Sequence, residues 1–98
     1  MSLVTHVAVP PTVRRADIPA LCGSLSEQLR GRDGGVVICD VAGARADMVT
    51  VEALVRLRLT ARRYGWTLAI QGAGTPLTDL VALLGLTSVL SRPPPDSG

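Results

Sequence analysis

The stretch that decides the fold is Val-Val-Ile-Cys-Asp-Val at residues 36–41, which begins directly after Gly35. A short apolar run rich in β-branched residues is typical of a strand that is buried on both faces of a sheet. Residues 31–35 read Gly-Arg-Asp-Gly-Gly, and such a cluster predicts a turn immediately before the run. We therefore expect residues 36–41 to form a central strand, not an edge strand.

A strand and a helix are predicted before this central run. Residues 3–9 alternate between two faces, and the prolines that follow end this strand because proline has no N–H for a ladder. Residues 13–15 are a candidate for a short second strand. Asp17 is a suitable N-cap for a helix over residues 17–30, with Pro19 in the first turn, where a missing N–H costs nothing. The apolar residues of this helix recur at helical spacing: Ile18, Leu21, Cys22, Leu25 and Leu29.

Two helices and a strand are predicted after the central run. The first helix covers residues 48–64 and ends at Gly65, a residue type that is common at helix C-termini. Residues 66–71 then form a third strand, and a last helix covers residues 75–84. Strands that alternate with helices along the chain indicate a largely parallel sheet.

The predicted fold class is α/β, as a single small domain. Its sheet is largely parallel or mixed, with four to five strands and three to four helices. The domain spans residues 1–91, and residues 89–90 are a candidate for its last short strand. Residues 92–98 contain three prolines and are predicted to be a disordered tail.

The composition indicates a small core and excludes several kinds of partner. The chain has 98 residues, of which 47% are apolar, but no Phe, one Tyr and one Trp, so the core must consist of aliphatic side chains. All ten basic residues are arginines, and the net charge of +2 is too small to indicate binding to nucleic acid. No signal peptide and no membrane-spanning run is visible. We expect a cytoplasmic protein without membrane insertion.

Signals of catalysis are nearly absent from the sequence. The only histidine, His6, lies within a predicted strand, and it forms no metal-ligand set with Cys22 and Cys39. Both cysteines lie in apolar runs, which is typical of reduced, buried thiols. The loop at residues 72–74 reads Gly-Ala-Gly and precedes a helix, but the third glycine of a phosphate-binding loop is replaced by Leu77. We expect no enzyme, no catalytic residue, no cofactor and no metal.

Two carboxylates lie near the C-terminal ends of the predicted strand at residues 36–41 and of the loop after it, where parallel sheets often bind ligands. Asp40 and Asp47 have the residue type of an acid/base pair, but no third partner accompanies them. We therefore expect Asp40 and Asp47 to hydrogen-bond to backbone N–H groups in a turn and a helix cap.

The helix over residues 48–64 carries the pattern that points to function. One face has an ordinary core stripe: Ala53, Leu54, Leu57, Ala61 and Tyr64. The opposite face has the pattern of a solvated surface: Glu52, Arg56 and Arg63. A further line, the apolar strip, lies off the core direction and consists of Val51, Val55 and Leu59. Arg58 and Arg62 lie beside it. Apolar anchors beside arginine are enriched in protein interfaces, although a broad core could also cover this strip.

Residues 36–90 resemble the STAS family, the sulfate-transporter and anti-sigma-factor-antagonist domain. The matching pieces follow the family's spacing: Val-Val-Ile-Cys-Asp-Val at 36–41, Asp47, Val-Glu-Ala-Leu-Val-Arg-Leu at 51–57, Ala-Arg-Arg-Tyr-Gly at 61–65 and Leu-Leu-Gly-Leu at 83–86. The resemblance implies a STAS-like fold and a non-catalytic role in binding a regulatory protein partner.

The chain departs from the family at the start of the second helix. Members that are switched by phosphorylation carry Asp-Ser-Ser-Gly or Asp-Ser-Thr-Gly there. Asp47 matches the aspartate, but Met48 and Val49 replace the hydroxyl residues, and Thr50 falls at the glycine position. A second alignment, drawn from Asp40, places Thr50 at the second hydroxyl position. The resemblance thus implies a module without the usual phospho-switch, with Thr50 as the one candidate acceptor.

The resemblance leaves several partners open. The first is an anti-sigma factor or histidine-kinase-like ATPase, and the alternative is the ATPase of an ABC-type lipid transport system. A homodimer is also compatible with the sequence, and a small-ligand or nucleotide binder stays open as a third class. The residues expected to bind the partner are Asp47, Met48, Val49, Thr50, Val51, Val55, Arg58, Leu59 and Arg62.

Overall fold

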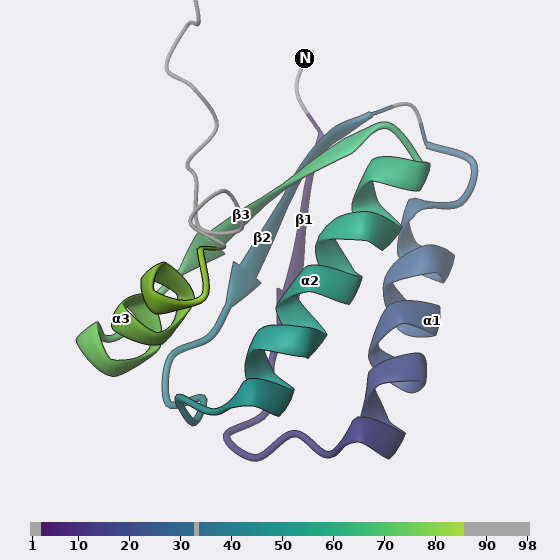
Figure 1. Ribbon diagram of the computed structural model, residues 1–98. Coiled ribbons are helices and arrows are strands. Elements are labelled where there is room, and N and C mark those ends of the chain that lie inside the picture. The colour runs from purple at the N-terminus through teal and green to yellow at the C-terminus, as the bar shows by residue number, and fades with distance from the viewer. Residues whose placement is uncertain (1–2, 33, 86–98) are drawn as a thin grey trace, which may run out of the picture.

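The computed structural model describes residues 3–32 and 34–85. Their elements follow one another along the chain as β1 (Val4–Ala8), the 3-10 helix η1 (Arg15–Asp17), α1 (Ile18–Leu29), β2 (Gly35–Asp40), α2 (Met48–Arg63), β3 (Trp66–Gln71) and α3 (Thr75–Leu83). The three strands of this described part form one parallel sheet in the order β1-β2-β3 (Figure 1). The predicted α/β class and the predicted central position of β2 are therefore confirmed.

The helices begin and end within a residue or two of the predicted bounds, but the predicted number of strands is not confirmed. The strand expected at residues 13–15 was wrong, because Arg15 begins the helix η1. The Asp17 carboxylate accepts a hydrogen bond from the Arg14 N–H at 3.1 Å, and the Asp17 N–H donates to the Arg14 carbonyl at 2.8 Å. Such local bonds compete with a sheet ladder for the same backbone groups. The strand expected at residues 89–90 and the tail at 92–98 lie outside the described residues.

Helices α1 and α2 lie side by side over one face of the sheet (Figure 1). The strand side chains on that face are buried: Thr5, Val7, Val37, Cys39, Trp66 and Leu68. Alternate residues point to the other face, where Val36 and Ile38 of β2 are half-buried and Val4 of β1 is 53% exposed. The expectation that β2 is buried on both faces was therefore wrong, because the described helices α1 and α2 both pack on the same side.

The aliphatic core is centred on α2, as its core stripe predicts. Ala53, Leu54, Leu57 and Ala61 are fully buried, and Tyr64 is half-buried. This face packs against α1 and β3, and Trp66 closes the core from β3 with 2% exposure. Because one face of α2 is fixed in this way, the residues about 180° away must point to solvent.

Within residues 3–32 and 34–85, no helix combines the length and apolar character needed to cross a membrane.

Candidate functional site

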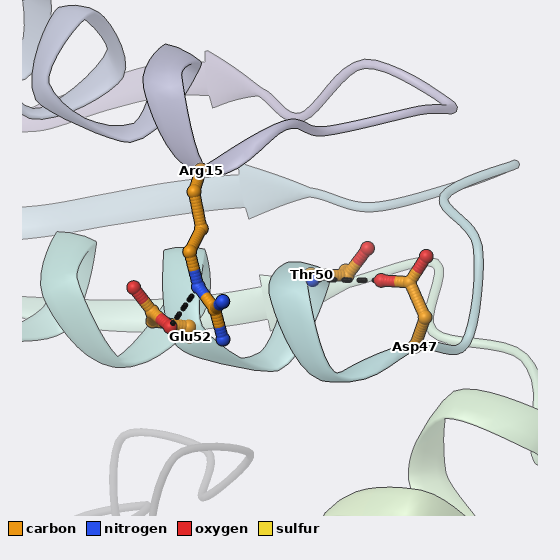
Figure 2. Close-up of polar contacts among 4 residues, drawn as sticks. All are labelled: Arg15, Asp47, Thr50 and Glu52. Carbon is orange, nitrogen blue, oxygen red and sulfur yellow. Dashed lines mark hydrogen bonds and ion pairs between the residues drawn. The ribbon is translucent and has the colours of Figure 1, made fainter.

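The N-terminal turn of α2 begins at a capped aspartate. Asp47 has an extended backbone (φ −134°, ψ 172°), and its Oδ1 accepts a hydrogen bond from the Thr50 N–H at 2.9 Å (Figure 2). This hydrogen bond holds the pKa of Asp47 below its ordinary value of 3.8. Met48 is 54% exposed and Val49 is half-buried. The cap predicted for Asp47 is confirmed, and the next two side chains are apolar and partly or largely accessible.

The hydroxyl of Thr50 is enclosed in the protein. Thr50 is fully buried, and its Oγ1 has no hydrogen-bond partner among the described residues. Its backbone N–H is occupied by the Asp47 carboxylate. A kinase needs the acceptor oxygen at the surface, so the turn at residues 47–50 would have to open before Thr50 could be modified.

The apolar strip predicted on α2 is exposed at only one end. Val51 is 2% exposed, Val55 is half-buried and Leu59 is 49% exposed. The reason is geometric: each step of four residues turns about 40° around a helix, so an i, i+4, i+8 line cannot stay on one side. The line leaves the core edge at Val51 and reaches solvent at Leu59. The expectation that Val51 is a surface anchor was wrong.

The structure separates the predicted partner-binding residues into three groups. Two are buried: Thr50 and Val51. Four are half-buried: Asp47, Val49, Val55 and Arg58. Three are exposed: Met48, Leu59 and Arg62. Met48, Val55, Leu59 and Arg62 lie on the outward side of α2, whereas Val49 and Arg58 lie on opposite flanks of the helix.

A groove of about 870 Å³ runs between α1 and α2, and the sequence analysis missed it. Its apolar lining comes from both helices: Ile18, Pro19, Cys22 and Leu59. Its charged and polar lining comes mostly from α2: Arg15, Glu52, Arg56, Thr60, Arg62 and Arg63. We call this feature the α1–α2 groove. It includes Leu59 and Arg62, which the sequence analysis had selected, and it extends that surface towards α1.

One ion pair spans the groove. Arg15 Nε donates to Glu52 Oε1 at 3.2 Å, which connects η1 to the first half of α2 (Figure 2). An exposed pair of this kind contributes at most about 1 kcal/mol to stability. Its larger effect is on charge, because it neutralises Glu52, the carboxylate in the lining. Arg56, Arg62 and Arg63 have no ion-pair partner within the described parts of the chain.

The sequence carried a partial signal of this groove. Arg56, Leu59 and Arg63 are spaced i, i+3 and i+7, so they share one side of α2. By spacing alone, the two arginines belong to a solvated face of α2, and Ile18 and Cys22 belong to the core stripe of α1. The side-by-side packing of α1 and α2 is not visible in the sequence, because it depends on contacts between residues far apart in the chain.

The groups weighed for catalysis lie apart from one another. His6 is exposed on the sheet face away from α1 and α2, and both cysteines are free. Burial, with a smaller contribution from nearby Asp40, raises the pKa of Cys39 to about 12, whereas Cys22 is half-buried in the α1–α2 groove. Among residues 3–32 and 34–85, no three His, Cys, Asp or Glu side chains gather as metal ligands would.

The turn role expected for Asp40 is confirmed. Its Oδ1 accepts a hydrogen bond from the Ala42 N–H at 2.9 Å. The loop at residues 72–74 packs onto this turn: Gly72 has φ +81°, and a Cβ there would lie 3.1 Å from the Ala42 Cβ and 3.2 Å from the Asp40 carboxylate. The turn at residues 40–42 therefore packs directly against Gly72 at the start of this loop.

Comparison with protein-family models, with curated proteins and with solved structures finds no match for this chain. The resemblance to the STAS family thus stays a prediction from the residues quoted above.

Proposed function

We propose that this chain is a non-catalytic, cytoplasmic protein-binding module of the STAS type, which resembles anti-sigma factor antagonists but lacks the usual serine phospho-switch. The observation that carries this proposal is the outward side of α2. There Leu59 is 49% exposed and lies among arginines that have no ion-pair partner in the described structure. A STAS-like sheet of four to five strands is part of the proposal.

The outward side of α2 has the chemistry of a contact surface. Leu59 supplies an apolar anchor, and full burial of a leucine side chain contributes about 1.5–3 kcal/mol, so covering its exposed half is a sizeable gain. Val55, one turn earlier, is half-buried and continues this surface towards Met48. The arginine stems can cover further apolar area while their guanidinium groups stay solvated.

The start of α2 supports a module that binds without a phosphate switch. Met48 and Val49 have no hydroxyl group, and the Thr50 hydroxyl is enclosed. A phosphate at this helix terminus would add about two negative charges, which is how the switch implied by the resemblance would break a complex. With no accessible acceptor in this turn, partner binding would be constitutive or regulated elsewhere.

The proposal is tested by affinity capture from the native lysate with a matched pair of variants. Leu59→Asp places a charge at the proposed anchor, and Leu83→Asp places the same charge on α3 at a leucine that is 83% exposed. We expect the natural chain and Leu83→Asp to recover the same partner and Leu59→Asp to lose it. If Leu59→Asp, folded by circular dichroism, recovers the partner equally well, the proposed face is wrong.

The identity of the captured protein separates the two partner classes. A histidine-kinase-like ATPase or anti-sigma factor supports the regulatory role proposed here. An ABC ATPase supports the alternative, a subunit of a lipid transport system. A captured metabolic enzyme, or no partner at all, would contradict both.

A further inference from the structure

The lining of the α1–α2 groove is asymmetric. On the α1 side it is apolar, with Ile18 buried, Cys22 half-buried and Pro19 exposed beside them. On the α2 side, Leu59 lies between Arg56 and Arg63, one helical turn from each. A ligand that fills the groove must therefore present apolar groups to α1 and to Leu59 and negative charge along the α2 side.

The spacing of the arginines further restricts the ligand. Arg56 and Arg63 are two turns apart, which corresponds to about 10 Å along the axis of α2. Carboxylates two turns apart on a second helix have the same separation when that helix lies along the groove. Because Glu52 is already paired with Arg15, it does not cancel the charge of these arginines.

We propose that the α1–α2 groove binds an acidic amphipathic helix of a protein partner, with its apolar stripe on Cys22 and Leu59 and its carboxylates towards Arg56 and Arg63. This inference rests on the proposed function, because it assumes a protein partner. It adds the chemistry of the bound segment, its orientation across the groove and the contribution of α1. Helix-in-groove recognition of this kind uses apolar anchors at i, i+3, i+4 and i+7.

The same arginines fit a nucleic acid or an anionic lipid surface less well. Sites for single-stranded nucleic acid combine cations with aromatic rings on which bases stack, and no aromatic side chain lines the described groove. A lipid surface requires anchors that protrude from the protein, whereas Ile18 and Cys22 lie in a recess between two helices. A recessed apolar floor beside an arginine row matches an amphipathic helix.

The test uses three synthetic peptides of about 20 residues, long enough to be helical when bound. The acidic probe has leucines at i, i+3, i+4 and i+7 spacing and glutamates along one flank. The basic probe has lysines in place of the glutamates, and the scrambled probe keeps the composition of the acidic one. We expect the acidic probe to bind the full chain at least about tenfold more tightly than either of the others, as judged by fluorescence anisotropy.

Cys22 reports whether the peptide occupies this groove. It is half-buried in the lining, while Cys39 is fully buried with a pKa raised to about 12, so iodoacetamide near pH 8 should alkylate Cys22 selectively. We expect saturating acidic peptide to abolish alkylation of Cys22. If the peptide binds while Cys22 stays fully reactive, the peptide lies elsewhere and the proposal is wrong.

Charge reversal tests the role of the arginines. Arg56→Glu/Arg63→Glu should weaken binding of the acidic probe by about tenfold or more and should strengthen binding of the basic probe. The matched control is Arg30→Glu/Arg45→Glu, which changes the net charge equally at two exposed positions outside the groove and should bind as the natural chain does. If the charge-reversed chain does not fold, the milder variant Arg56→Gln/Arg63→Gln replaces it and should also weaken binding of the acidic probe.

Three outcomes would overturn the inference. They are equal binding of the acidic and scrambled probes, equal losses in the groove and control variants, and displacement of the acidic probe by an oligonucleotide or by anionic vesicles at matched charge concentration. If the peptide test fails while Leu59→Asp still abolishes partner capture, the inference fails alone and the proposed function stands. If no protein partner can be captured, the proposed function fails whatever the peptides do.

Discussion

The carboxylate of Asp47 accepts the backbone N–H of Thr50 at 2.9 Å, and this bond fixes the start of the helix on which the proposed function depends. It satisfies one of the N–H groups that a helix leaves unpaired at its N-terminus. It also favours the ionised form of Asp47, which lowers the pKa of that carboxyl.

Replacing Asp47 by alanine should lower the stability of the domain in a pH-dependent way. Because the pKa of Asp47 is lower in the folded chain than its ordinary 3.8, the cap contributes fully above that pH and is lost as the pH falls through the folded pKa. Denaturant melts between pH 7 and pH 3 should show the natural chain and Asp47→Ala converging at the acidic end. Asp47→Asn, which caps without titrating, should keep most of the stability and none of this convergence. Parallel melting curves for all three chains would contradict the prediction.

Thr50 should resist phosphorylation in the folded chain and tolerate loss of its hydroxyl. Its Oγ1 is buried without a partner in the described structure, so Thr50→Val, of nearly equal shape, should change the free energy of unfolding by less than about 1 kcal/mol or raise it. Incubation with an anti-sigma kinase and ATP should leave the intact mass of the natural chain unchanged. Stoichiometric phosphate on Thr50 would mean that the turn at residues 47–50 opens readily and that the second alignment, drawn from Asp40, is the right one.

The two ends of the apolar strip should respond oppositely to the same substitution. Val51→Asp buries an unpaired charge at a residue that is 2% exposed, which costs several kcal/mol and should leave the chain unfolded at room temperature. Leu59→Asp changes a side chain that is 49% exposed and should alter the free energy of unfolding by about 0.5 kcal/mol. Thermal melts followed by circular dichroism compare the two. Similar melting temperatures would show that the helix is rotated relative to the core described here.

The two cysteines should differ sharply in reactivity. The thiolate is the reactive form, and a pKa of about 12 leaves almost none of it at Cys39 near neutral pH. Mass spectrometry after brief alkylation should find one label, on Cys22, and Cys22→Ser should take up none until denaturant is added. Because the pKa of Cys39 is raised from 9.0, the stability of the fold should also decline as the pH rises above about 9. Rapid labelling of Cys39 in the native chain would contradict its enclosure.

Sequence patterns predicted the helices and strands of this fold better than they predicted which of their side chains are buried. The run at residues 36–41 and the 3.6-residue stripe of α2 are local signals, and both were interpreted correctly as a central strand and a core-facing helix. The exposure of Val4 and the half-burial of Val36 depend on which face of the sheet the helices cover, and no local pattern records that. No strand forms at residues 13–15, because the Asp17 side chain and backbone hydrogen-bond to the backbone of Arg14 instead.

The candidate site likewise combines residues that a local pattern identifies with residues that no local pattern identifies. Leu59 and Arg62 could be selected from α2 alone, because exposure follows from helix geometry once the core stripe is known. The α1 side of the groove could not, because Cys22 and Ile18 have the spacing of ordinary core residues. Only the packing of α1 beside α2 places them next to Arg56 and Arg63.

The order of the strands in the sheet has a consequence for how the chain folds. Val4 pairs with Val36 and Gly35 with Trp66, so each ladder must close a loop of about thirty residues before its first hydrogen bond forms. The strands lie in the sheet in the order in which they are synthesised, and each new strand can add to the previous one without threading. The first strand pair can form while Trp66 is still unmade, but its apolar face then has only α1 to cover it. If α2 and β3 must pack before the sheet is stable, substitutions in the core stripe of α2 should slow refolding as well as weaken the folded state, which stopped-flow refolding kinetics would measure.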